Sequence, residues 1–352
     1  MARILLLAQP PDGGVFQHVS QLAEGLAARG HEPVVETLGM VRAVSPAADA
    51  RAVARAAALV RRVRPALVHA HSSKAGAVAR LARPAFPRTP LVYTPHGYAF
   101  AGWFEDPAER RRYRLAERAL APLATRVLCV CEAERRLAAE IGPADRVSVV
   151  HNGIGSPTPA PVHPAVAELA ARGPVIGVVT LLRPGKGIET LIDALPAVLG
   201  LHPTASVAIA GDGPDRAALG ERASALGVAH ALRLVGETAG PMPVLHGADL
   251  FVSASWAESF PYNVLEAMAA GLPVVATDVG GTGEAVEHES TGLVVPPRDA
   301  GALSAAIARL IADPGLGTRF GEAGRRRVEE RFGVERMIEG TLAVYRRAGG
   351  LP

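Results

Sequence analysis

Short apolar runs that each lead into a helical segment constrain this chain more than any other feature. Arg3–Ala8 (RILLLA) is a continuous apolar run, typical of a strand buried on both faces of a parallel sheet. Residues 9–14 then form a loop with paired glycines, and a helix with an apolar period follows from Phe16 to Ala28. Strand, glycine loop and helix in this order open a doubly wound α/β unit. The chain is therefore predicted to begin with a Rossmann-like domain.

The same unit recurs along the chain. A length of 352 residues favours two domains, and Gly155–His163, rich in proline and glycine, is typical of a linker. The sequence thus predicts an amino-terminal domain over 1–160 and a second parallel-sheet domain over 161–333. Further strands are expected at 31–37, 65–70, 91–94, 126–130 and 146–150 in the first domain, and at 174–180, 206–210, 232–237, 249–253, 272–276 and 292–296 in the second.

Composition and cysteine spacing indicate a cytoplasmic protein. Apolar residues make up 49% of the chain, but no apolar run reaches the about 20 residues needed to span a bilayer. The first residues are too short and end in the wrong residue types for a signal peptide. Cys129 and Cys131 stand two apart, where a bridge is rare and two ligands make a poor metal site. We expect both to be buried free thiols.

The net charge of +3 is spread unevenly. Residues 1–160 carry 21 Lys+Arg and 13 Asp+Glu, a balance of +8, and the remainder carries 16 and 21, a balance of −5. Such asymmetry is typical of a domain that meets an acidic partner or an anionic membrane surface. Arginine-rich composition produces the same asymmetry without any partner. Both interpretations stay open, and no nucleic acid is expected.

Residues 257–278 (AESFPYNVLEAMAAGLPVVATD) combine an acidic loop with a helix start. Glu258 follows an apolar run, Pro261 favours the first turn of a helix, and Gly271 with Pro273 ends it. A helix N-terminus carries unpaired N–H groups and partial positive charge, which suits a phosphate. Glu258 and Glu266 can accept hydrogen bonds from hydroxyls on either side of that phosphate. The arrangement fits a sugar joined to a nucleotide by a diphosphate.

The same residues have a purely structural interpretation. Asn263 and Glu266 stand three apart and can form a capping box, with Asn263 as the N-cap. Glu258 can equally be a solvated loop residue. From the residues alone the two interpretations are evenly balanced.

The order Glu258, seven residues, Glu266, followed by AMAAGLPVVATDVGG, resembles the signature of the retaining nucleotide-sugar glycosyltransferases of family 4. The resemblance extends over nearly the whole chain. It implies the GT-B fold, in which two Rossmann-like domains face each other across a cleft, with residues 334–352 packing back on the first domain. It also implies transfer of a sugar to an acceptor hydroxyl without a cofactor or metal.

The resemblance implies roles for particular residues. Glu266 would hold the ribose and Glu258 the transferred sugar, while Lys186 would stabilise the leaving diphosphate. The family's arginine, five residues before this lysine, is replaced here by Leu181, and Arg183 is a possible substitute. The full set of expected donor-binding residues is Gly13, Gly14, Arg183, Lys186, Gly211, Gly236, Glu237, Phe260, Pro261, Tyr262, Asn263, Val264, Leu265 and Glu266.

Two further segments belong to the acceptor side in this comparison. His96, just after the strand 91–94, matches the family's HG motif, whose histidine approaches the transferred sugar. With Glu258 and Lys186 it completes the predicted catalytic set. His71, Ser72, Ser73 and Lys74 lie in HSSKAG, which resembles a loop of members that build bacterial polysaccharides. Alternatively, Ser72 or Ser73 only caps the helix 74–81.

Tyr98–Asp106 (YAFAGWFED) is aromatic and is followed by Arg110, Arg111, Arg112 and Arg114. It is either buried packing or an acceptor-side lip that contacts membrane. The donor base, the sugar and the acceptor (a glycan, a lipid-linked or a small molecule) are left open by the sequence. Alternative functions are a non-catalytic nucleotide-sugar-binding protein, or another GT-B enzyme such as a nucleotide-sugar epimerase or a natural-product glycosyltransferase.

Overall fold

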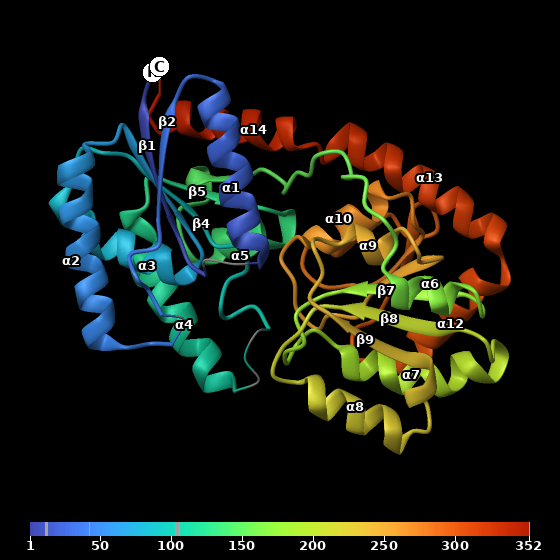
Figure 1. Cartoon of the computed structure of the whole chain (residues 1–352). Coiled ribbons are helices and arrows are strands. Elements are labelled where there is room, and N and C mark those ends of the chain that lie inside the picture. Colours follow the sequence, from blue (N-terminus) through green and yellow to red (C-terminus); the bar gives the residue numbers. More distant parts are fainter. Residues whose placement is uncertain (11–12, 42, 103, 105, 352) are drawn as a thin grey trace. The chain divides into compact units, whose positions relative to one another are not determined.

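The computed structural model describes the chain except for residues 11–12, 42, 103, 105 and 352. It contains two compact units: unit 1 is formed by residues 1–153 and 334–352, and unit 2 by residues 154–333. Each unit has a six-stranded parallel sheet with helices packed on its faces (Figure 1). The predicted α/β fold class, with two doubly wound parallel sheets, is confirmed.

The sheet of unit 1 has the strand order β2-β1-β3-β4-β5-β6. Its strands are β1 Arg3–Ala8, β2 Glu32–Glu36, β3 Leu67–His71, β4 Leu91–Thr94, β5 Arg126–Cys129 and β6 Val147–Val149. Its helices are α1 Gly13–Ala28, α2 Pro46–Val63, α3 Ser73–Ala82, α4 Pro107–Leu120, α5 Glu132–Ile141 and α14 Val334–Arg347. Short 3-10 turns lie at Arg83–Ala85, Ala121–Leu123 and Ala144–Arg146.

The sheet of unit 2 has the order β12-β11-β10-β7-β8-β9. Its strands are β7 Val175–Val179, β8 Ser206–Ala210, β9 Leu232–Gly236, β10 Leu250–Ser253, β11 Val274–Thr277 and β12 Gly292–Val295. Its helices are α6 Pro164–Ala170, α7 Ile188–Leu201, α8 Arg216–Ala225, α9 Met242–Leu245, α10 Tyr262–Ala269, α11 Thr282–Ala285, α12 Ala300–Ala312 and α13 Pro314–Arg331, with a 3-10 turn at Ala229–Ala231.

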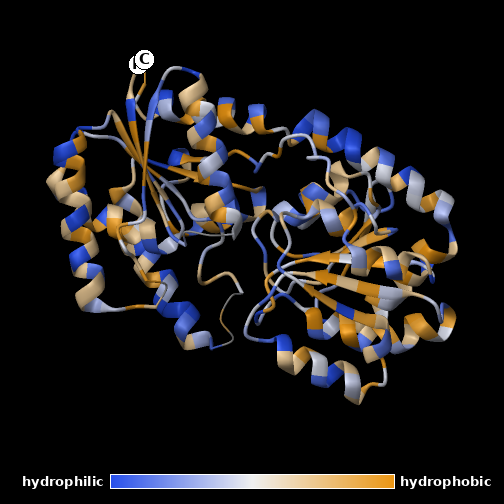
Figure 2. Ribbon diagram, viewed as in Figure 1, coloured by the Kyte–Doolittle hydropathy of each residue, from blue (hydrophilic) through white to orange (hydrophobic). Residues whose placement is uncertain are grey.

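Apolar strands make the core of each unit, because a parallel sheet covered by helices is buried on both faces. In unit 1, Ile4 and Leu6 of β1 face a cluster with Leu22 of α1 and Leu342 of α14, and Leu5 faces the opposite cluster under α2 and α3. Figure 2 shows this distribution, with hydrophobic strands inside and hydrophilic residues mostly on helices and loops. The carboxyl-terminal helix α14 is therefore part of the core of unit 1.

Some helices begin earlier than the apolar period predicts. α1 starts at Gly13 rather than at Phe16, and the apolar period of α2 likewise begins only after a first turn at Pro46. Proline suits the first turn because its fixed φ is helical and its missing N–H would be unpaired there anyway. Periodicity cannot detect such a turn, since it contains no residue that faces the core.

The two cysteines are buried free thiols, as predicted. Cys129 ends β5, and the Cys131 sulfur accepts a bond from the Glu134 amide at the start of α5. Within the described part of the chain, no helix is both long enough and apolar enough to cross a bilayer.

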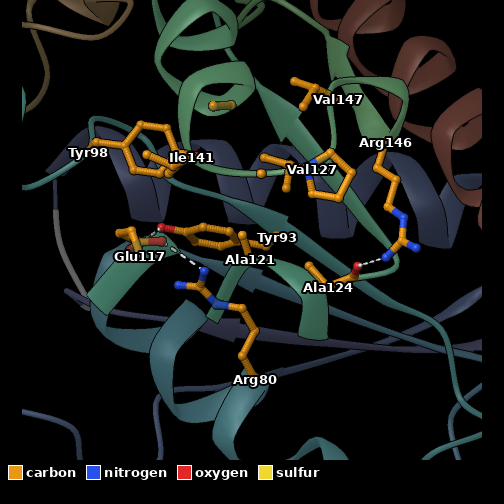
Figure 3. A pocket seen from close by; sticks show the side chains of 13 residues that line it. Arg80, Tyr93, Tyr98, Glu117, Ala121, Ala124, Val127, Ile141, Arg146 and Val147 are labelled. Atoms are coloured by element: carbon orange, nitrogen blue, oxygen red, sulfur yellow. Dashed lines mark hydrogen bonds and ion pairs between the residues drawn. The ribbon is translucent and has the colours of Figure 1, made fainter. Parts of the chain in front are cut away.

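A buried ion pair joins α3 to α4 in unit 1. The Arg80 guanidinium donates to Glu117 at 2.8 Å, and the Tyr93 hydroxyl donates to the other carboxylate oxygen at 3.0 Å. Arg80 also lies over the Tyr93 ring, 4.1 Å from its centroid (Figure 3). Beside these residues is a cavity of about 10 Å³, room for a single water. It is too small for a nucleotide or a sugar.

Replacing Glu117 by Gln should destabilise the protein by about 3 kcal/mol, because removing one partner leaves the Arg80 charge buried without a counter-charge. Both side chains of the pair are almost fully buried, 1% and 7% exposed. Glu140→Gln, in the exposed Arg114–Glu140 pair, is the matched control and should cost less than about 1 kcal/mol. Chemical denaturation measures both, and equal small losses would contradict the assignment.

Candidate functional site

The unit 2 sheet brings the loops after β7 and β10 together. These strands are neighbours, yet the chain leaves them toward opposite edges of the sheet, so a switch point lies between them. In open parallel sheets, ligands bind at the carboxyl ends of the strands on either side of such a point. Lys186 follows β7 and Glu258 follows β10. Two of the predicted catalytic residues therefore meet at the place where this fold binds ligands.

Lys186 and Glu258 form an ion pair with little exposure to solvent. The Lys186 ammonium donates to Glu258 Oε1 at 2.5 Å, and the Ser255 hydroxyl donates to the same oxygen at 2.8 Å. The Lys186 and Glu258 side chains are 14% and 10% exposed. The interpretation of Glu258 as a solvated loop residue is therefore wrong.

Two glycines let neighbouring loops approach this pair. Gly187 has a φ of +67°, and a Cβ atom there would lie 1.9 Å from the Ala254 carbonyl oxygen. Gly280, in the glycine-rich turn after β11, has a φ of +56°, and its Cβ would lie 2.0 Å from the carbonyl oxygen of Glu258. Both loops thus press directly on the backbone of the acidic loop, where no side chain fits.

Helix α10 begins beside this loop, but not as a capping box. Pro261 is the N-cap and Tyr262 the first helical residue. Asn263 lies inside the first turn, where its side-chain amide donates to the Val179 carbonyl at 2.9 Å and its oxygen accepts from the Val264 amide. The predicted alternative role of Asn263 as N-cap is wrong. Its side chain instead ties α10 to the end of β7.

The other predicted donor residues around α10 are largely buried. The side chains of Phe260, Val264 and Leu265 are at most 3% exposed, and the Leu265 amide donates to the Pro261 carbonyl. Tyr262 is also buried, and burial, followed by the charge of Glu266, raises the pKa of its hydroxyl well above the usual value. Glu266 itself is half-buried. The side chains of Val264 and Leu265 are therefore closed to a ligand, and their amides already donate to the Asn263 side chain and the Pro261 carbonyl.

The remaining predicted donor residues of unit 2 lie at neighbouring strand ends. The Gly211 amide, just after β8, donates to the Gly236 carbonyl at the end of β9 at 2.7 Å, and Glu237 beyond it is exposed. Arg183 is half-buried, and its backbone carbonyl accepts a hydrogen bond from the Lys186 amide at 3.3 Å. Leu181, in the place of the family's arginine, is 48% exposed.

In unit 1, Gly13 and Gly14 are the first residues of α1 and not loop residues as expected. Their amides lie at a helix N-terminus, which is compatible with the predicted contact to a phosphate. Residues 11 and 12 of the same predicted loop lie outside the described residues.

His96 and His71 come together at the carboxyl ends of β4 and β3. A His71 nitrogen lies 3.1 Å from a His96 nitrogen in a hydrogen bond. His96 has a φ of +52°, a backbone conformation that is costly for a residue with a side chain and often found at functional sites. The His71 side chain is fully buried, and burial lowers the pKa of both imidazoles well below the usual value.

The rest of the acceptor-side loop is occupied by structural contacts. Ser72 is the N-cap of α3, but its hydroxyl makes no capping bond. The Lys74 ammonium donates to Asp49 of α2 at 2.8 Å. Ser73 is the first residue of α3. Ser72 therefore occupies the N-cap position, as the alternative predicts, but its side chain does not cap the helix.

The described aromatic residues of the segment 98–106 are packed against neighbouring rings, as the first interpretation predicts. Tyr98 is 2% exposed and stacks on Phe100, which is buried packing. Phe104 stacks on Tyr113 of α4. Trp103 and Glu105 lie outside the described residues.

Sequence reasoning missed Ser255 and Gly280. Ser255 has one signal, its place three residues before a predicted catalytic carboxylate in the same strand-to-helix loop. Gly280 has none besides lying in a glycine-rich turn, because only the folded chain shows which backbone atom it touches.

Fold and site together define a GT-B scaffold, and comparison with known proteins assigns the family. Residues 12–155 match the family described as "Glycosyltransferase Family 4", and residues 162–327 match "Glycosyl transferases group 1". The chain belongs to these glycosyltransferases, with a family 4 domain followed by a group 1 domain.

Named relatives support this assignment. The chain is 31% identical over 267 residues to a glycogen synthase of Mycobacterium tuberculosis, covering 73% of this chain and 63% of that protein. It is 34% identical over 250 residues to a GDP-mannose-dependent alpha-(1-6)-phosphatidylinositol monomannoside mannosyltransferase of Mycolicibacterium smegmatis, covering 67% of this chain and 64% of that protein. The chain thus spans somewhat less than two thirds of the length of these relatives.

Solved structures share the fold. A sucrose-phosphate synthase from Thermosynechococcus elongatus superposes with a TM-score of 0.86 at 24% identity, over 99% of both chains. Anabaena HepE in complex with UDP-glucose superposes with a TM-score of 0.79 at 23% identity, over 100% of both chains.

Gly280→Ala should destabilise the protein by more than about 1–2 kcal/mol. That is the cost of left-handed backbone for a residue with a Cβ, and the overlap with the Glu258 carbonyl adds to it. Gly220→Ala is the control, since Gly220 lies within α8 with open space around its Cβ position, so alanine there should be neutral or slightly stabilising. Urea unfolding distinguishes the two. A Gly280 variant as stable as the Gly220 variant would show that the turn does not press on the acidic loop.

Proposed function

We propose that this protein is a retaining glycosyltransferase, which moves a sugar from a nucleotide-sugar donor to an acceptor hydroxyl without a catalytic metal. The observation that carries the proposal is the Lys186–Glu258 ion pair at the unit 2 switch point. A pair with so little exposure is costly unless its partners are satisfied. A nucleotide-sugar donor can satisfy both partners when the pair opens. Its diphosphate accepts hydrogen bonds from the Lys186 ammonium, and a sugar hydroxyl donates a hydrogen bond to the Glu258 carboxylate.

The chemistry follows from these roles. The bond between the anomeric carbon and the phosphate oxygen breaks, and the electron pair leaves with the nucleoside diphosphate. Lys186 and the amides at the start of α10 stabilise the charge that develops there, the kind of electrostatic help that usually contributes most. Glu258 holds hydroxyls of the transferred sugar, and Ser255 keeps the carboxylate in place. The acceptor oxygen attacks the same face that the phosphate leaves, and the phosphate takes its proton.

Further assignments come from the family pattern. Glu266 binds the ribose, and His96 of unit 1 contacts the transferred sugar. The names of similar proteins support a nucleotide-sugar donor, since HepE was solved with UDP-glucose and the mycobacterial mannosyltransferase is GDP-mannose-dependent. The glycogen synthase is named for a glycan, and the mannosyltransferase for a phosphatidylinositol monomannoside. A glycan or lipid-linked acceptor is therefore part of the proposal.

Ligand-induced thermal shifts test the donor site. UDP, GDP and their sugars should raise the melting temperature when they bind the folded state. Lys186→Ala should weaken nucleoside diphosphate binding at least about 10-fold, a loss of about 1.4 kcal/mol. Glu258→Gln should keep most of that binding but lose sugar transfer from a labelled donor, because its contact is with the sugar.

Asp193→Asn, in the exposed Arg222–Asp193 pair of the same unit, is the control and should change neither property. Product NMR then reports the anomeric configuration, and an inverted product would refute the retaining mechanism. A protein that binds the nucleotide but neither transfers nor hydrolyses the sugar would be the non-catalytic binder instead.

We also propose that unit 1 contacts an anionic membrane surface on the cytoplasmic side through α4. Arg111, Arg112 and Arg118 of this helix are exposed, and Leu115 among them is 56% exposed. Basic side chains with interspersed apolar ones suit anionic lipid, at about 1 kcal/mol for each arginine near the surface.

Vesicle co-sedimentation tests the membrane contact. Binding to phosphatidylglycerol vesicles should exceed binding to phosphatidylcholine vesicles and fall with salt. An Arg111→Ala/Arg112→Ala variant should lose about 10-fold or more, whereas Arg222→Ala in unit 2 should not. Equal binding to both lipids, or equal losses in both variants, would contradict the proposal.

A further inference from the structure

Three histidines from separate elements of unit 1 converge on one buried point. His18 lies in the first half of α1, His71 ends β3, and His96 follows β4. One ring nitrogen of each lies within 4.8 Å of the corresponding atoms of the other two. The ring centroids of His18 and His96 are 4.7 Å apart, and those of His71 and His96 are 5.4 Å apart.

One nitrogen of His71 has no hydrogen-bond partner among the residues that the structure describes. His71 is fully buried, and its Nε2 makes no hydrogen bond. A buried polar atom left in this way costs about 1–3 kcal/mol, so it needs an explanation. Its other nitrogen is already bonded to His96, which leaves Nε2 as a free ligand atom among imidazoles.

Neighbouring residues orient the rings. The His18 Nδ1 lies 3.1 Å from the Asn152 side-chain oxygen, and this oxygen accepts a hydrogen bond when Nδ1 carries the ring proton. That tautomer leaves the lone pair on the other nitrogen of His18. His69 packs against His71 with tilted rings, their centroids 3.9 Å apart, and hydrogen-bonds Tyr345 and Thr94 through its two nitrogens. Such outer contacts, which fix tautomer and ring orientation, are typical around metal-binding histidines.

Metal ligation uses the lone pair of a neutral imidazole nitrogen. His96 is the least buried of the three histidines.

We propose that His18, His71 and His96 form a site for a divalent transition-metal ion of the zinc class, with the fourth position open. Imidazole nitrogen is a preferred ligand of Zn²⁺, Ni²⁺ and Cu²⁺. Tetrahedral zinc with Zn–N bonds of about 2.1 Å places its ligand nitrogens about 3.4 Å apart. The ring nitrogens of the three histidines lie within 4.8 Å of one another, so binding an ion requires the rings to rotate toward this spacing and the hydrogen bond between His71 and His96 to open.

The site has a consequence that rests on the proposed function. If His96 contacts the transferred sugar, an ion bound to His96 competes with the sugar for the same imidazole. Metal binding should then lower the rate of sugar transfer, whereas binding of the ion itself does not depend on any activity. The two claims therefore fail separately.

Titration with Co²⁺, followed by its visible absorption, tests the site on the full, metal-stripped chain. We expect one equivalent with a tetrahedral spectrum, displaced by Zn²⁺. His71→Gln and His18→Gln should each weaken the affinity by more than about 100-fold, and Asn152→Ala by about 10- to 100-fold. His230→Gln, an exposed histidine of unit 2, is the control and should bind as the parent does. Circular dichroism of the metal-free variants reports whether they fold.

Crystals of the unaltered protein grown with Zn²⁺ give a test that needs no variant. An anomalous peak among the three imidazoles supports the site. A peak only at surface histidines, no saturable Co²⁺ binding, or equal losses in His71→Gln and His230→Gln would overturn it. Stoichiometric binding without inhibition of transfer would keep the metal site and count against the role of His96 in the proposed reaction.

Discussion

Burial of both faces of each parallel sheet is the constraint on which the rest of this structure depends. Helices cover the strands, so polar chemistry has no place along them and is confined to strand ends. The neighbours β7 and β10 of unit 2 continue toward opposite edges of the sheet, and so do β1 and β3 of unit 1. Lys186 and Glu258 occupy the first of these places, and His71 lies at the second. Topology, more than any local motif, brings these side chains together.

The Lys186–Glu258 pair illustrates what that confinement costs. Only two of the 37 basic residues are lysines, and each is held by a carboxylate, Lys74 by Asp49 and Lys186 by Glu258. Lys74 braces α3 against α2, a structural contact. Lys186 instead stands between Gly185 and Gly187, two glycines with positive φ, and a Cβ at Gly187 would overlap the Ala254 carbonyl. Since an ammonium is a compact charge on a flexible stem, it can move from carboxylate to diphosphate more readily than a guanidinium fixed in two bonds.

Sequence reasoning predicted the helices and strands, and which loops carry the site, better than it predicted the hydrogen-bond partners of individual side chains. The strands of β1 and β4 agree with their apolar runs to the residue, because a doubly buried strand leaves an unbroken apolar signal. The prediction of Asn263 as N-cap was wrong because local spacing does not reveal a partner that is distant in the sequence. Its spacing to Glu266 fits a capping box, and only the tertiary structure shows that Val179 is the acceptor for its amide. The same holds for Ser255 and Gly280, whose partners are set by folding and not by neighbouring residues.

Unit 1 treats its buried polar groups in two different ways, and the contrast explains why the histidines stand out. Arg80 is charged, and Glu117 and Tyr93 surround it with opposite charge, a hydrogen bond and an aromatic face. Burial acts to lower the pKa of Arg80, but the charges of Tyr93 and Glu117 raise it, so the Arg80 guanidinium stays protonated. Around His71, by contrast, lie the imidazole rings of His18, His69 and His96. Imidazoles grouped in this way are kept neutral by burial and by one another. Imidazole nitrogens that face one buried point contribute nothing to an ion-pair network, but they are preferred ligands of divalent transition-metal ions.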